Sequence, residues 1–205
     1  MSVLIISYRR DFAVLCADKR QIKNDTGEIV SDDATKIEEW SPVIAVGYAG
    51  IAGLAKRIMI AAHAMINETG IDRCSVEDIG NLMCQGYYAL MDMDKDVPRD
   101  ALAIIVVAGK MANGKMGISI ATLTKEIADL EIYEGDGSVK TIILEPNDIP
   151  EGKCYQLFNE AVMDIQIARF LPGDPVEMLH RRAVVKISEY SKQVGPKADF
   201  IYIHK

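Results

Sequence analysis

The chain has 205 residues, of which 49 % are hydrophobic and 26 % are charged, a composition typical of a globular protein and not of a disordered one. A domain of this length buries about 70 % of the surface of its unfolded chain, so its stability requires no disulfide or structural metal. The formal net charge of −7, without a long basic stripe, argues against nucleic acid or an anionic membrane as a partner.

The cysteines and histidines give no sign of a metal site. The four cysteines form no CxxC pair and the three histidines are scattered, so zinc ligation has no support, and nothing in the sequence implies a bound cofactor. The N-terminal sequence has no signal-peptide pattern, and the longest apolar run, residues 101–108, is too short to span a membrane. These features predict reduced cysteines and a cytoplasmic location.

The first fifty residues are expected to form mainly strands. Residues 2–8 and 12–17 are apolar runs separated by a polar turn, which predicts a hairpin. A chain that begins inside a buried strand is unusual, because termini normally fray. A polar stretch follows as far as residue 33, and a further strand is predicted over residues 42–46, with the glycine-containing segment 47–50 ending it.

From residue 51 the spacing of the apolar residues becomes helical and predicts a helix that ends near Gly70. Ser75 followed by Asp78 is a capping-box pattern, which predicts the start of a second helix. The predicted inward face of the first helix consists of Leu54, Ile58, Ala61, Ala62 and Met65.

The second half of the chain repeats this order of strands followed by helices. Four strand-like runs are followed by a helix predicted over residues 154–171, a helix that starts after Asp174, and a closing strand over residues 200–203. Helices in blocks between antiparallel strands favour an α+β fold in which helices cover the outside of paired sheets, with residues 1–205 as a single domain. The four strand-like runs are residues 101–108, 116–123, 129–133 and 139–144.

This order of elements resembles the proteasome β-type N-terminal-nucleophile (Ntn) hydrolases, a family with a four-layer αββα sandwich fold that includes bacterial and archaeal homologues. In that family the first residue of the mature chain is the nucleophile, and the second strand of the first hairpin ends in an acidic residue. Here that strand ends at Asp18, and the family's spacing leads back to Ser2, which becomes the first residue if Met1 is removed. Lys36 and Gly47 match the family's lysine and a strand-ending glycine, and residues 134–139 and 198–201 resemble two later motifs.

The resemblance implies hydrolysis of amide bonds through an acyl-enzyme on Ser2. A serine hydroxyl needs a base to remove its proton, and the α-amine of Ser2, with an unperturbed pKa of roughly 7.7–8.0, is expected to supply it. Lys36 is expected to lower the pKa of that amine by charge repulsion, and Asp18 is expected to orient Lys36. The Gly47 N–H is expected to donate to the oxyanion.

The resemblance also implies a peptide or protein substrate and assembly into a homo-oligomeric ring. The chain has no Walker-type glycine loop, so any use of nucleotide belongs to a partner such as an ATP-dependent unfoldase. Two family features are missing. The turn before the third helix, residues 149–153, has no serine, and the stretch before the final strand, residues 191–196, has no acidic residue.

These departures leave two alternatives open. One is an inactive scaffold of the same fold that retains Met1, and the other is an amidase that acts on small molecules. Simpler roles also exist for single residues. Asp18 fits a surface residue paired with its basic neighbours, and Lys36 fits a solvated charge. Gly47 and Gly50 both fit a tight strand–helix turn, and this role suits Gly50 better.

Overall fold

A computed structural model describes the whole chain except residues 1, 24, 67–69, 94–100, 168–173 and 205. The first half contains strands β1 to β6, helices α1 and α2 and a short 3₁₀ turn between these helices. The second half contains strands β7 to β10, helices α3 and α4 and the final strand β11. In chain order they are β1 (Leu4–Arg9), β2 (Phe12–Asp18), β3 (Gln21–Ile22), β4 (Ile29–Ser31), β5 (Ile37–Ser41), β6 (Ile44–Gly50), α1 (Ala52–Ile66), the 3₁₀ turn (Ile71–Arg73), α2 (Val76–Met93), β7 (Leu102–Lys110), β8 (Met116–Thr124), β9 (Ala128–Glu134), β10 (Lys140–Leu144), α3 (Lys153–Ile167), α4 (Pro175–Ser188) and β11 (Ala198–His204).

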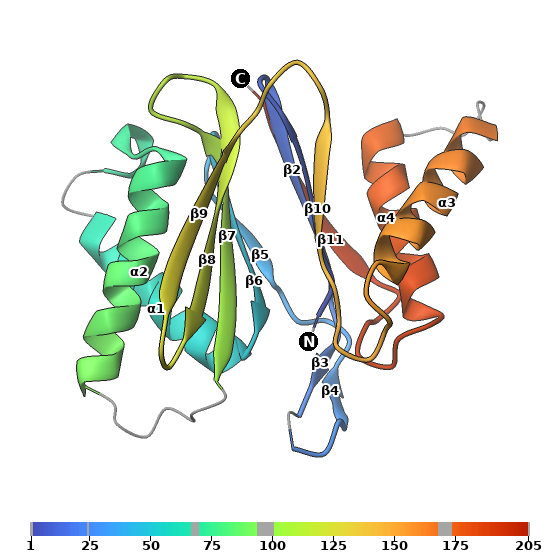
Figure 1. The fold of residues 1–205 in the computed structure, drawn as a ribbon, viewed down its shortest axis with the longest axis horizontal. Helices are drawn as coiled ribbons and strands as arrows, with labels where there is room; N and C mark the ends of the chain where they lie inside the picture. The colour runs from blue at the N-terminus through green and yellow to red at the C-terminus, as the bar shows by residue number, and fades with distance from the viewer. Residues whose placement is uncertain (1, 24, 67–69, 94–100, 168–173, 205) are drawn as a thin grey trace.

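Two antiparallel sheets lie face to face, and each carries a pair of helices on its outer side (Figure 1). The four-stranded sheet has the order β10-β1-β2-β11 and is covered by α3 and α4. The five-stranded sheet has the order β5-β6-β7-β8-β9 and is covered by α1 and α2. Strands β3 and β4 form a separate two-stranded hairpin. The α+β class expected from the sequence is therefore present.

Strand β1 shows how the layers are held together. Successive side chains of a strand point to opposite faces, so Leu4 and Ile6 lie in the core between the two sheets. Ile5 points the other way, into the core under α3 and α4. A third core lies under α1 and α2 and includes Ile58 and Met83. Because both faces of β1 are buried, its first three residues, Leu4, Ile5 and Ile6, are all apolar instead of alternating with polar ones.

Several local predictions are confirmed. The first hairpin is present, and Leu4 pairs with Ala17 across it. The capping box is also present, because the Asp78 carboxylate accepts from the Ser75 N–H at 2.9 Å while the Ser75 hydroxyl accepts from the Asp78 N–H at 3.2 Å. The last residues of the predicted third helix, 168–171, lie outside the described residues.

Two local predictions are wrong. Strand β6 continues to Gly50, so Gly47 does not end it. The inward face of α1 is displaced, because Met65 is 38 % exposed and Ile66 is buried in its place. The polar stretch before residue 33 also contains a hairpin that was not predicted, β3 and β4, because its partly exposed residues lack a strong apolar pattern.

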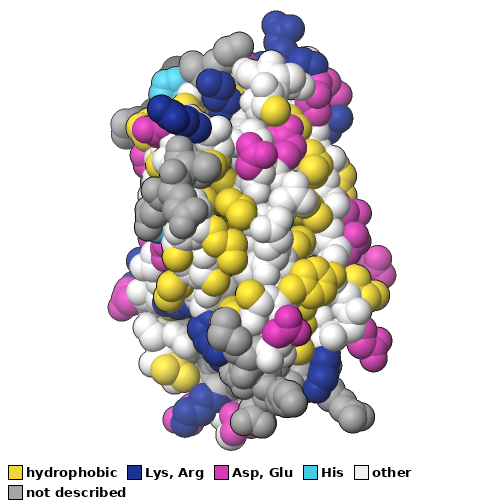
Figure 2. Space-filling model, turned by 90° about the vertical axis from the view of Figure 1, so that its left-hand side faces the viewer, with side chains coloured by type: hydrophobic (Ala, Val, Ile, Leu, Met, Phe, Trp, Pro, Cys, Tyr) yellow, Lys and Arg dark blue, Asp and Glu magenta, His cyan; other side chains and the backbone are white. Residues whose placement is uncertain are grey.

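Both outer helical faces expose some apolar side chains, including Met163 of α3 at 62 % exposure. The face formed by α1 and α2 carries exposed apolar side chains, including Ile60 at 70 % and Tyr88 at 56 % exposure, and Figure 2 shows apolar groups spread over it. On the other side, α3 and α4 are joined by the Lys186–Asp164 ion pair at 3.1 Å. Among the described residues, no helix is both long and apolar enough to cross a membrane.

Candidate active site

The end of β2 places the Asp18 carboxylate in the interior, where its side chain has no exposed surface. The carboxylate receives four hydrogen-bond donors: the N–H groups of Val3 at 3.0 Å, Arg20 at 2.9 Å and Gly195 at 3.2 Å, and the Lys36 ammonium at 2.9 Å. A buried charge is tolerated only when it is paired and hydrogen-bonded in this way. Asp18 therefore joins the start of the chain, β2, the lysine and a segment close to β11.

Lys36 lies directly before β5, and only 4 % of its side chain is exposed. Its ammonium group pairs with Asp18 and also donates to the backbone carbonyl of Arg20. Burial lowers the pKa of the Lys36 amine, and the neighbouring Asp18 charge opposes this shift. Since both members of the pair are buried, Asp18 is not a surface residue and Lys36 is not a solvated charge.

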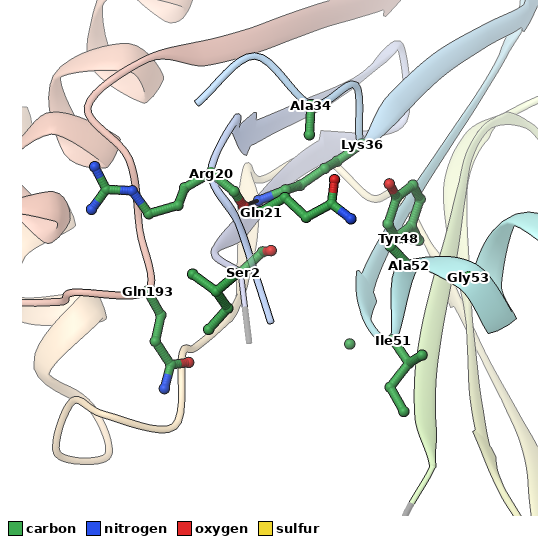
Figure 3. A pocket seen from close by; sticks show the side chains of 12 residues that line it. Ser2, Arg20, Gln21, Ala34, Lys36, Tyr48, Ile51, Ala52, Gly53 and Gln193 are labelled. Atoms are coloured by element: carbon green, nitrogen blue, oxygen red, sulfur yellow. Dashed lines mark hydrogen bonds between the residues drawn. The ribbon is translucent and has the colours of Figure 1, made fainter. Parts of the chain in front are cut away.

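A cavity of about 170 Å³ opens beside this pair, and Ser2 and Lys36 both line it (Figure 3). Ser2 is half-buried and directly precedes Val3, whose N–H is bound by Asp18. The structure therefore brings Ser2, Asp18 and Lys36 into one region, with Asp18 behind the lysine. The complete lining consists of Ser2, Arg20, Gln21, Ile22, Ala34, Lys36, Tyr48, Gly50, Ile51, Ala52, Gly53 and Gln193.

The start of α1 forms another wall of the cavity. Gly50 has a φ of +91°, and a Cβ there would lie 2.3 Å from the Leu102 carbonyl oxygen, so only glycine fits the turn. The Ile51 N–H donates to that same oxygen at 2.9 Å. The next N–H groups, of Ala52 and Gly53, belong to the first helical turn, where N–H groups have no partner within the helix. With no acidic side chain in this turn, the positive end of the helix dipole borders the cavity.

The structure does not bring Gly47 to the cavity. The Tyr48 N–H donates to the Lys36 carbonyl at 3.0 Å, and the alternation of an antiparallel strand then directs the Gly47 N–H toward β7. A Cβ at Gly47 would meet the Ile37 Cγ2 atom at 2.9 Å, inside the core between the sheets. The structure therefore gives no support to Gly47 as the oxyanion donor, whereas Gly50, the glycine at the strand–helix turn, lines the cavity.

Tyr48 binds the backbone carbonyls of two successive residues, Thr35 and Lys36. Its hydroxyl donates to the Thr35 carbonyl at 3.1 Å, while its N–H binds the Lys36 carbonyl. Burial raises the pKa of Tyr48 to about 12, so the hydroxyl keeps its proton at neutral pH and remains a donor. Sequence reasoning missed this residue, because an aromatic residue in an apolar strand predicts only core packing.

The charged groups of the cavity are already paired within the protein. Besides the Lys36–Asp18 pair, the Arg20 guanidinium binds Asp32 at 2.7 Å. Among the described residues, no group of three or more His, Cys, Asp or Glu side chains is arranged to hold a metal ion. The cavity thus offers the hydroxyls of Ser2 and Tyr48, two carboxamides, helix N–H groups and an ion-paired lysine.

Comparison with known proteins identifies the fold. No family model matches the chain, and no curated protein matches its sequence. By contrast, 562 chains of solved structures match in structure, so this fold is common and does not by itself determine the function. One of them is eukaryotic HslV from Trypanosoma brucei, with a TM-score of 0.59 and 14 % identity over 99 % of each chain. At that identity the likeness establishes the fold over the whole length, and the site must be argued from its geometry.

Proposed function

We propose that the protein is a proteasome-like peptidase of the Ntn-hydrolase class, with the four-layer αββα sandwich fold and Ser2 as its nucleophile. The observation that carries the proposal is the buried Asp18 carboxylate. It binds both the Val3 N–H, next to Ser2, and the Lys36 ammonium that lines the Ser2 cavity. The likeness to HslV over the full chain supports the same class.

Removal of Met1 turns Ser2 into the terminal residue and gives its amine the role of base. The Ser2 oxygen forms a bond to the substrate carbonyl carbon while its proton passes to the α-amine. That proton then leaves with the departing amine as the C–N bond breaks, and water hydrolyses the resulting ester. The Lys36 charge lowers the pKa of the α-amine and keeps it unprotonated near neutral pH.

The developing negative charge on the substrate oxygen requires hydrogen-bond donors. In place of Gly47, we assign this role to the N–H groups of Ala52 and Gly53 in the first turn of α1, because both residues line the cavity. Their N–H groups stand at the positive end of a helix that has no acidic residue in its first turn. Gly50 fixes the direction in which that helix enters.

Assembly into a homo-oligomeric ring in the cytoplasm, with an ATP-dependent unfoldase as partner, forms part of the same proposal. The exposed apolar side chains on α1 and α2, such as Ile60 and Tyr88, support a contact between copies, because monomers rarely leave such groups clustered in solvent. Sedimentation of the purified protein measures the number of copies, and a monomer at micromolar concentration contradicts the ring.

Two other functions are favoured by specific observations. An inactive scaffold that retains Met1 is favoured by the two missing family features, the serine within residues 149–153 and the acid within residues 191–196. An amidase for small molecules is favoured by the small volume of the cavity, about 170 Å³. A peptide substrate, however, needs to place only one side chain and its neighbouring backbone there.

The test begins with the intact mass of protein purified from its own host, which must lack one methionine. Ser2→Ala is then expected to lower peptide hydrolysis at least about 10³-fold, as loss of a nucleophile does in other acyl-transfer enzymes. Ser138→Ala, on the turn after β9, is the matched control and is expected to keep full activity. A retained Met1, or an active Ser2→Ala protein, contradicts the mechanism.

A further inference from the structure

A segment close to the end of the chain passes beside Ser2. Gln193, which precedes β11, is half-buried and lines the same cavity as Ser2. Figure 3 shows Gln193 on the opposite side of Ser2 from Tyr48 and Ile51. A substrate bound at the Ser2 hydroxyl therefore meets the Gln193 side of the cavity as well as the helix side.

The residues before Gln193 are held on two sides. The Ser191 hydroxyl donates to the Asp148 carboxylate at 2.7 Å and accepts from the Gln193 N–H at 3.0 Å. The Lys192 N–H donates to the same carboxylate at 2.9 Å, and the Lys192 carbonyl accepts from the Arg20 guanidinium at 3.2 Å. Ser191 is only 3 % exposed, whereas Lys192 lies at the surface and is held there through its backbone.

The residues after Gln193 are held as firmly. Val194 is fully buried in the core under α3 and α4, and the Gly195 N–H donates to Asp18 at 3.2 Å. A Cβ at Gly195 would lie 3.1 Å from the Arg20 Cβ, so the segment packs closely against Arg20, which lines the cavity. The backbone of Gln193 is therefore fixed before any substrate arrives, which reduces the entropy lost on binding.

The chemistry of the cavity determines what Gln193 can recognise. Arg20 and Lys36 are neutralised by Asp32 and Asp18, so the walls carry no unpaired charge among these groups. A carboxamide both donates and accepts hydrogen bonds, which matches the N–H and C=O of a peptide group. Among the described residues, the remaining lining adds no further charged side chain, which favours an uncharged substrate segment.

We propose that Gln193 is a specificity-determining residue that binds a backbone peptide group of an uncharged substrate segment, next to the bond that Ser2 attacks. The proposal rests on the proposed function of Ser2. It adds a substrate contact that the acyl transfer at Ser2 does not itself require. It assigns to the 191–195 segment a binding role in place of the acidic group that the family carries there.

The test compares Gln193→Met, which keeps the size of the side chain, with Gln156→Met on the exposed face of α3 as control. With an uncharged capped peptide, Gln193→Met is expected to raise KM about tenfold and leave kcat within twofold, as loss of one hydrogen bond in a dry site does. A depsipeptide that lacks the adjacent N–H is expected to bind wild type and Gln193→Met equally. A KM unchanged in Gln193→Met, or a penalty that persists with the depsipeptide, overturns the role of Gln193.

A second measurement separates this inference from the proposed function. Calorimetric titration of the capped peptide into Ser2→Ala protein and into the Ser2→Ala/Gln193→Met double variant needs no turnover. About tenfold weaker binding by the double variant supports Gln193, and equal binding overturns it. If the wild type shows no Ser2-dependent hydrolysis while Gln193-dependent binding persists, the proposed peptidase function is wrong and the binding role of Gln193 still holds. Thermal unfolding midpoints of all variants are expected to agree within a few degrees, and a larger drop for Gln193→Met overturns the binding role in favour of a structural one.

Discussion

Strand β1 separates two serines with opposite surroundings. Ser2, before the strand, is half-buried at a cavity. Ser7, within the strand, is 2 % exposed, and its hydroxyl lies 2.9 Å from the Nε2 atom of the equally buried His180. By residue type, the serine–histidine pair looks more like a nucleophile with its base than Ser2 does. By access, only Ser2 can meet a substrate.

The interior pair has also used its hydrogen-bonding capacity. His180 Nδ1 donates to the Val176 carbonyl at 2.7 Å, which leaves Nε2 to accept from Ser7. The Ser7 hydroxyl lies 2.9 Å from that of Thr141 as well. Burial lowers the pKa of His180, which keeps the ring neutral. The comparison teaches that accessible and incompletely satisfied groups indicate chemistry better than residue type does.

The largest expected effect comes from Lys36→Met, which removes the buried partner of Asp18. An unpaired buried carboxylate is expected to lower the free energy of unfolding by about 3–5 kcal/mol, and hydrolysis at Ser2 is expected to fall with it. Urea unfolding measures the first and a peptide assay the second. Lys23→Met, which breaks the exposed Lys23–Glu28 pair, is the control and is expected to change neither. If Lys36→Met and Lys23→Met changed stability and hydrolysis equally, the buried Lys36–Asp18 pair would matter no more than an exposed ion pair.

Ser7→Ala tests the interior side of the comparison. Loss of its hydroxyl leaves the His180 Nε2 atom without that donor and is expected to lower the free energy of unfolding by about 1–3 kcal/mol. Peptide hydrolysis is expected to stay within twofold of wild type, because no substrate reaches Ser7. A Ser7→Ala protein as inactive as Ser2→Ala would reverse the assignment of the two serines.

The pH dependence of stability sharpens the same contrast. The pKa of His180 is lower in the folded chain than the unfolded value of about 6.5. Its contribution is therefore fully present above pH about 6.5 and is lost as pH falls toward the folded pKa, since the unfolded chain binds the proton first. Urea unfolding at pH 7.5 and 5.0 measures this loss, which His180→Gln is expected to reduce. An unchanged pH slope in His180→Gln would show that His180 does not titrate differently on folding.

The smallest expected effect belongs to Tyr48→Phe, which removes the hydrogen bond to the Thr35 carbonyl and keeps the ring. A single neutral hydrogen bond of this kind contributes about 0.5–1.5 kcal/mol. We expect kcat to fall a few-fold through looser placement of Lys36, and the alkaline limb of the pH–rate profile to move. A fall in stability with an unchanged profile would assign Tyr48 to the core alone.

The features that sequence could predict are local or carried by a short motif. The apolar runs around residue 10 specify the first hairpin, and Asp18 and Lys36 stand at motif positions that the structure brings together. The Gly195–Asp18 hydrogen bond joins residues 177 positions apart, and no local pattern encodes such a contact. The direction of the Gly47 N–H, toward β7 and away from the cavity, is set by strand pairing that no local pattern encodes.

The convergence of distant segments on Asp18 has a consequence for synthesis of the chain on the ribosome. The carboxylate gains the Gly195 N–H, and β2 gains its outer neighbour β11, only after nearly the whole chain has emerged. At about 5–20 residues per second, the hairpin that carries Ser2 exists for many seconds before that closure. A nascent chain therefore exposes Ser2 before the Gln193 segment is in place, and the cavity is completed only once that segment and β11 have emerged.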